Sequence, residues 1–108
     1  MSAAGHWFIT PHAIQRFRQR IAALDDAHAL AAIIHGMEHP IAMRATRRRD
    51  GTPTWDFGVD GEYRFIATVV PSLDPALRPA VLTILPATRG KDKRRGMLTW
   101  ERSTWRYL

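Results

Sequence analysis

Hydrophobic side chains recur every three or four residues early in the chain, a spacing that places them on one face of a helix. Thr10 and Pro11 precede this stretch. They are a typical helix start, because the threonine hydroxyl caps a free N–H and proline has no N–H to leave unpaired at the first helical position. The predicted first helix spans residues 11–24, and its apolar face consists of Ile14, Phe17, Ile21 and Leu24.

A second helical stretch follows directly. Asp25 and Asp26 offer the next N-cap, since carboxylates are favourable at a helix N-terminus. Alanines favour helix throughout the stretch, and Gly36 and Pro40 mark its end. The predicted buried stripe of this helix consists of Leu30, Ile33, Ile34 and Met37.

After Pro40 the hydrophobic pattern changes to the two-residue period of strands. Asp50-Gly51 and Asp60-Gly61 are favoured hairpin dipeptides, and the three prolines within residues 71–79 predict a loop. The predicted strands span residues 41–47, 54–59, 62–70 and 80–85, with a further short apolar run at 7–10. The apolar residues 80–85 are typical of a central strand. We therefore predict an α+β fold, with two N-terminal helices packed on a largely antiparallel sheet of about four strands.

The charge of the chain is concentrated near its C-terminus. The formal net charge is +6, yet residues 1–86 contribute only +1 of it. Residues 87–108 hold seven basic and two acidic side chains, a net of +5, together with Trp100 and Trp105. The predicted organisation is a single domain over residues 1–86 followed by a basic, tryptophan-containing C-terminal arm over residues 87–108. Basic clusters of this kind indicate phosphate-backbone partners, or else a solvated surface with a flexible tail.

Composition excludes several classes of protein. The chain has no cysteine, which rules out disulfides, thiol catalysis, iron–sulfur clusters and cysteine-based zinc sites. Its longest apolar runs are far shorter than the roughly 20 residues of a membrane-spanning helix. Met1 to Gly5 has neither the basic nor the apolar region of a secretory signal. We expect a cytoplasmic protein with no membrane partner and no cofactor.

The first predicted helix carries the most specific chemical pattern. His12, Arg16 and Arg20 stand four residues apart and form a stripe beside the apolar face. Guanidinium groups bind phosphate through paired donors, and histidine is the usual proton carrier near neutral pH. The stripe is therefore either a surface that binds phosphate and transfers protons, or an ordinary solvent-exposed helix face whose arginines keep the protein soluble.

The segment Thr10–Ile21 (TPHAIQRFRQRI) resembles the opening helix of small RelE/BrnT-like proteins, with His12, Arg16, Phe17 and Arg20 in the corresponding places. A later strand with Glu62, Tyr63 and Arg64, then an apolar strand and a basic end, is also similar. The resemblance implies a small α+β fold and, for many family members, a toxin of a toxin–antitoxin pair that cleaves RNA without metal. It carries over only His12, Arg16 and Arg20.

These patterns lead to a first hypothesis, an RNA-binding protein similar to metal-independent endoribonuclease toxins. The predicted catalytic residues are His12 as base or acid, with Arg16 and Arg64 as the cations around the phosphate. Glu62, Tyr63 and Tyr107 are the candidates for a second acid–base residue. The predicted nucleic-acid-binding residues are Arg20, Arg47, Arg48, Arg49, Arg89, Lys91, Lys93, Arg94 and Arg95. The basic arm would hold phosphates or be covered by an acidic antitoxin.

Two features have competing interpretations. Arg47 to Arg49 are a nucleic-acid contact only if their hairpin shares a face with the helix stripe, and otherwise a solvated tip. His28, His35 and His39 have a spacing that can bind zinc, but no matching acidic or cysteine ligand accompanies them. We therefore expect ordinary polar histidines and no metal.

The second hypothesis is a non-catalytic interaction protein, for example from a phage or mobile element, that inhibits a host nucleic-acid-processing machine. Trp100 and Trp105 would then contact the host protein, because tryptophan and arginine dominate binding hot spots. A plain DNA-binding module is a third possibility, although neither helix has the character of a recognition helix.

Overall fold

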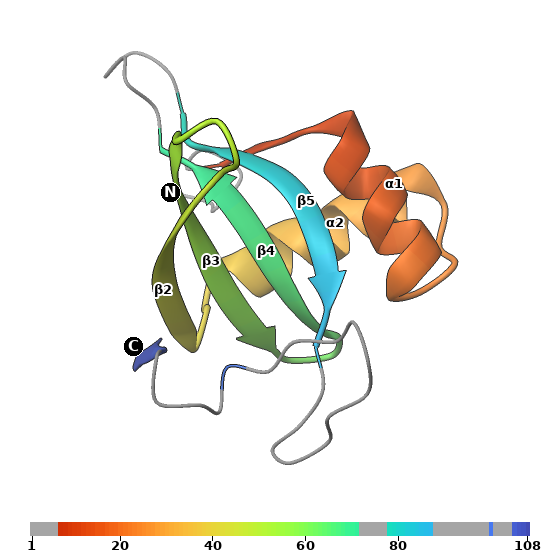
Figure 1. The fold of residues 1–108 in the computed structure, drawn as a ribbon. Helices are drawn as coiled ribbons and strands as arrows, with labels where there is room; N and C mark the ends of the chain where they lie inside the picture. The colour runs from red at the N-terminus through yellow and green to blue at the C-terminus, as the bar shows by residue number, and fades with distance from the viewer. Residues whose placement is uncertain (1–6, 72–77, 88–99, 101–104) are drawn as a thin grey trace.

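A computed structural model of the chain describes residues 7–71, 78–87, 100 and 105–108. The element order is β1 (Phe8–Ile9), α1 (Pro11–Arg20), α2 (Asp26–Met37), β2 (Ala42–Arg47), β3 (Pro53–Asp60), β4 (Arg64–Val70), β5 (Ala80–Pro86) and β6 (Arg106–Tyr107). Both helices lie on one side of a single sheet, with α2 behind the strands and α1 beside β5 (Figure 1). The predicted α+β class with two helices on one sheet face is confirmed.

Helix α1 begins as predicted but ends earlier. The Thr10 hydroxyl accepts a hydrogen bond from the Ala13 N–H at 3.1 Å, and Pro11 occupies the first turn. The helix stops at Arg20 rather than at residue 24, because the N–H groups of Ile21 and Ala22 both bond to the Phe17 carbonyl. Leu24 still packs against the core from the turn between the helices, which is why the apolar spacing runs past the helix end.

Helix α2 is capped by a carboxylate, as the sequence predicts. Asp25 Oδ1 accepts the His28 backbone N–H at 2.7 Å. Bonds from this N–H and from the His28 side chain hold the pKa of Asp25 below its ordinary value of 3.8. Of the helices in the described residues, none has the length and apolar character needed to cross a membrane.

Among the described residues the sheet has six strands rather than about four, in the order β1-β5-β4-β3-β2-β6. Strands β2 to β5 form an antiparallel meander, and the two-residue strands β1 and β6 extend its edges. Only β1 pairs in parallel within the described sheet, so the prediction of a largely antiparallel sheet is confirmed. Strand β5 is second from an edge, not central, and its apolar character reflects the cover that α1 provides.

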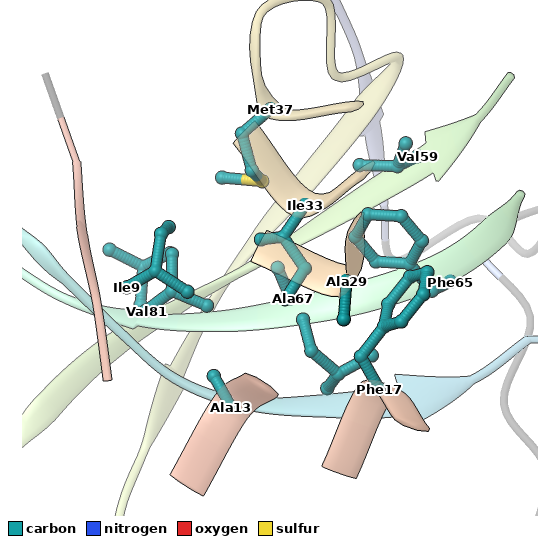
Figure 2. Close-up of a cluster of buried hydrophobic side chains, with 12 residues drawn as sticks. Ile9, Ala13, Phe17, Ala29, Ile33, Met37, Val59, Phe65, Ala67 and Val81 are labelled. Atoms are coloured by element: carbon teal, nitrogen blue, oxygen red, sulfur yellow. The ribbon is translucent and has the colours of Figure 1, made fainter. Parts of the chain in front are cut away.

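The main core lies between the helices and the sheet. Phe17 from α1 meets Phe65 from β4 edge to face, with ring centroids 5.6 Å apart (Figure 2). Ala29 and Ile33 from α2 pack into the same cluster, and all four side chains are buried. Phe65 faces the helices, as the alternation in β4 predicts.

A second, smaller core covers the opposite face of the sheet, which we call the open face. Trp100 and Trp105, only 1% and 6% exposed, pack there with Ala42 and Ile66. A Cβ at Gly58 would lie 2.6 Å from Trp100 Cδ2, so glycine is needed for this close approach. The described part of the predicted C-terminal arm thus belongs to the folded body. Residues 88–99 of that arm lie outside the described residues.

Candidate nucleic-acid site

A pocket of about 440 Å³ opens where the start of α1 meets the open face of the sheet. Its walls come from the start of α1 and from the tip of the β2–β3 hairpin, and its floor comes from β4 and β5. The lining residues are Thr10, His12, Arg48, Thr68, Leu82 and Thr83. The pocket therefore combines an imidazole, a guanidinium and hydroxyl groups from four separate segments.

The hairpin tip brings Arg48 to the pocket through a specific turn. The Gly51 N–H bonds to the Arg48 carbonyl at 2.9 Å, and Gly51 has a φ of 92°, which favours glycine. Asp50 accepts the Thr52 N–H at 2.9 Å, and contacts with the Thr52 side chain and backbone lower the pKa of Asp50. The hairpin follows the Asp50-Gly51 signal, and Figure 1 shows it curling at the end of the sheet where β5 begins.

The Arg48 guanidinium is available to a ligand. Within the described part of the chain its side chain makes no hydrogen bond or salt bridge, its charge acts on Asp50 at the same tip, and it lines the pocket. Its neighbours at the tip differ from it: Arg47 Nη1 donates to the Gly51 carbonyl at 2.9 Å, whereas Arg49, exposed like Arg48, does not line the pocket. Of the three arginines predicted at this turn, Arg48 is the one that the fold brings beside His12.

His12 and Arg16 are in direct contact on α1. Arg16 Nε donates to His12 Nε2 at 3.3 Å, and Arg16 Nη1 donates to Gln19 Oε1 at 2.9 Å. This contact places the Arg16 guanidinium against the Nε2 side of the imidazole. The predicted neighbours His12 and Arg16 therefore touch each other, and of the two only His12 lines the pocket.

The polar floor of the pocket continues into a buried network. Thr68 Oγ1 donates to Asp56 Oδ1 at 2.8 Å, and Arg44 Nε donates to Asp56 Oδ2 at 3.2 Å. The Thr46 and Thr54 hydroxyls bond to each other beside this network. The sequence pattern did not single out Thr68, because its bond to Asp56 depends on a neighbouring strand.

Arg64, which we predicted as a catalytic cation, lies away from His12. Its Nη1 contacts Asp60 Oδ2 at 3.0 Å, and its guanidinium stacks 3.7 Å from the Trp100 ring centroid. It precedes Thr68 by four residues on β4, which is about 13 Å along a strand. In this structure Arg64 holds the C-terminal tryptophan against the sheet instead of joining the pocket.

Other predicted residues serve the fold or lie elsewhere. Arg20 Nη1 donates to the Ile84 carbonyl at 3.0 Å and ties the end of α1 to β5. Glu62, Tyr63 and Tyr107 do not line the His12 pocket, so the structure identifies none of them as a second acid–base residue. The remaining predicted basic contacts, which fall outside the described residues, are Arg89, Lys91, Lys93, Arg94 and Arg95.

The two tryptophans predicted as partner contacts are buried against the chain's own sheet. Trp100 and Trp105 pack with ring centroids 6.4 Å apart, and the Arg44 guanidinium lies 4.7 Å from the Trp105 ring. A partner could reach these indoles only if they left the open face. Their burial corrects the expectation that they form a ready-made interface.

The two histidines of α2 and His39, which follows the helix, do not assemble a metal site. His28 Nδ1 lies 2.7 Å from Asp25 Oδ1, and His35 Nδ1 lies 3.9 Å from Glu38 Oε2. His28, His35 and His39 line a separate hollow between α2 and the β3–β4 turn. Over residues 7–71, 78–87, 100 and 105–108, no group of three or more potential ligand side chains is arranged to hold a metal.

Comparisons with known proteins leave the site to be argued from its own geometry. No protein-family model, no curated protein and no solved structure matches this chain.

Proposed function

We propose that this chain binds RNA at the His12–Arg48 pocket and cleaves it without a metal ion. The observation that carries the proposal is the convergence of His12 and Arg48 from separate segments in one open pocket. A guanidinium binds phosphate oxygens bidentately, and an imidazole transfers protons near neutral pH. The resemblance of Thr10–Ile21 to the opening helix of RelE/BrnT-like proteins supports the same activity.

The residues suggest how the reaction would proceed. A phosphate that enters beside Arg48 competes for Arg16, which now bonds to His12 Nε2, and the departure of Arg16 frees that nitrogen. His12 Nε2 then takes the proton of the reacting 2′-hydroxyl. The 2′-oxygen forms a bond to phosphorus, the bond to the 5′-oxygen breaks, and water protonates the departing oxygen. Arg16 and Arg48 stabilise the additional negative charge on the phosphate.

The test is cleavage of a single-stranded RNA in EDTA by the wild type and three variants. His12→Ala should lower the cleavage rate by about 100-fold or more while RNA affinity changes little, because general acid–base groups contribute on that order. Arg48→Ala should weaken RNA binding. It should also reduce the slope of log affinity against log salt concentration by about 1, since one phosphate contact is lost. Arg49→Ala is the matched control at the same hairpin tip and should behave as the wild type.

Other outcomes would contradict the proposal in separate parts. Wild-type RNA binding that depends on Arg48, without cleavage, would reject the catalytic part and leave an RNA-binding module. Absence of RNA binding would reject the whole proposal. Capture of a host nucleic-acid-processing protein would then favour the non-catalytic inhibitor.

A further inference from the structure

The Thr68 hydroxyl in the pocket floor has a fixed polarity. Its hydrogen is committed to Asp56 Oδ1 at 2.8 Å. A carboxylate can only accept hydrogen bonds, so the direction of this bond cannot reverse. Asp56 is itself held in place, because it is 5% exposed and its second oxygen accepts from Arg44. Thr68 therefore offers the pocket lone pairs and no hydrogen.

The other two threonines of the pocket differ from Thr68 in what they can offer a ligand. Thr10 Oγ1 donates to the Val81 carbonyl at 2.8 Å and accepts from the Ala13 N–H, so its bonding capacity is largely used within the fold. Thr83 lies directly opposite Thr68 in the sheet, and its hydroxyl has no hydrogen-bond partner among the described residues. It can rotate to donate or to accept. Among the pocket threonines, Thr68 is thus the one that has its hydrogen committed and, among the described residues, both lone pairs left for a ligand.

A fixed acceptor close to a cation selects a particular ligand chemistry. Arg48 attracts an anionic phosphate, whereas the Thr68 oxygen repels phosphate oxygens and requires a donor. In RNA, a donor hydroxyl accompanies every phosphodiester, and DNA lacks it. We infer that Thr68, oriented by Asp56, accepts a hydrogen bond from a ribose 2′-hydroxyl and makes the pocket selective for RNA over DNA.

This inference rests on the proposed function and adds a specificity-determining residue to it. The reacting 2′-hydroxyl gives its proton to His12, so the hydroxyl that Thr68 recognises belongs to a neighbouring nucleotide. Arg44 and Asp56 are positioning residues, because they act through Thr68 and do not line the pocket.

The experiment measures binding of three oligonucleotides of one sequence: RNA, DNA and 2′-fluoro RNA. The full-length His12→Ala variant is used throughout, so that the RNA stays intact. The 2′-fluoro sugar keeps the ribose pucker but cannot donate a hydrogen bond. We expect RNA to bind about tenfold more tightly than both other probes, the size of one hydrogen bond of about 1.4 kcal/mol.

Three further substitutions identify the source of the preference. Thr68→Val keeps the side-chain shape but removes the oxygen, and it should abolish the RNA preference while leaving DNA affinity unchanged. Thr68→Ser keeps the hydroxyl and should retain the preference. If Thr68→Val melts at a lower temperature, the serine variant still shows whether the hydroxyl is sufficient for the preference. Thr83→Val removes the other unbonded hydroxyl of the pocket and should keep the preference, and loss of the preference in this variant alone would overturn the role of Thr68.

The outcomes separate this inference from the proposed function. A well-folded Thr68→Val variant that still prefers RNA, or 2′-fluoro RNA that binds as tightly as RNA, would overturn the role of Thr68. Binding that depends on Arg48 but is equally tight for RNA, DNA and 2′-fluoro RNA would overturn this inference and leave the proposed RNA-binding site in place. Failure of all three probes to bind would overturn both proposals.

Discussion

Phe17 connects the helix that carries His12 to the sheet. Its side chain is fully buried, and its ring contacts Tyr63 and Phe65 edge to face, with centroid distances of 5.4 and 5.6 Å. Edge-to-face pairs add to the free energy gained from burial alone. The position of the His12–Arg16 pair therefore depends on an aromatic residue on the opposite face of the same helix.

We predict that Phe17→Ala lowers the free energy of unfolding by about 3–5 kcal/mol, the usual cost of removing a buried aromatic ring. Phe17→Leu should cost less, about 1.5 kcal/mol, because most of the volume remains. Urea unfolding followed by circular dichroism measures both. A loss below about 1 kcal/mol for Phe17→Ala would contradict the packing of α1 described above.

At the scale of elements, α2 begins at a charged cap. Asp25 bonds to the backbone N–H and side chain of His28, and these bonds lower its pKa. A carboxyl whose pKa is lower in the folded state than in the unfolded state contributes its full stabilisation at pH values above the pKa of the unfolded state. That stabilisation is lost as the pH falls through the pKa of the carboxyl in the folded state.

We predict that Asp25→Ala lowers the melting temperature near pH 7. The difference in melting temperature between the variant and the wild type should shrink as the pH falls below 3.8, the ordinary pKa of an aspartate. Asp25→Asn is the control, because asparagine also caps helices but does not titrate in this range. Melting curves at several pH values measure the effect. A difference that persists unchanged in acid would exclude the charged cap as its cause.

Across the whole molecule, the C-terminal residues complete the sheet and its second core. Trp100 rests on Gly58 beneath the Arg64 guanidinium, and β6 pairs with β2 at the sheet edge. The tryptophans cover one part of the open face, and the polar network of Asp56 and Thr68 occupies another part, next to the pocket. Truncation after residue 86 would therefore remove part of the fold along with the positive charge.

We predict that Gly58→Ala destabilises the protein by about 1–3 kcal/mol, because its methyl group would overlap the rigid Trp100 ring. Gly61→Ala is the matched control, since a Cβ there meets nothing within 4 Å, and it should change stability by less than about 0.5 kcal/mol. Chemical denaturation compares the two variants. Equal stabilities would show that Trp100 does not rest on Gly58.

Sequence patterns predicted the elements better than the site. The starts of α1 and α2 and the hairpin at Asp50-Gly51 follow from interactions among residues close in the chain, so local signals were sufficient. His12 and Arg16 were predicted together and do meet, because helical spacing sets their separation. Arg64 was grouped with them on residue type, but its partners Asp60 and Trp100 were not evident from its own strand.

Two helices and four longer strands among the described residues, and the excess of positive charge near the C-terminus, follow from the amino-acid sequence alone, since periodicity, caps and composition are local properties. The tertiary structure decided that Arg48 joins His12, that Thr68 is held by Asp56, and that Trp100 lies on Gly58. The physical reason is that these contacts join segments far apart in the chain. Strand order and register bring them together, and no local pattern specifies either.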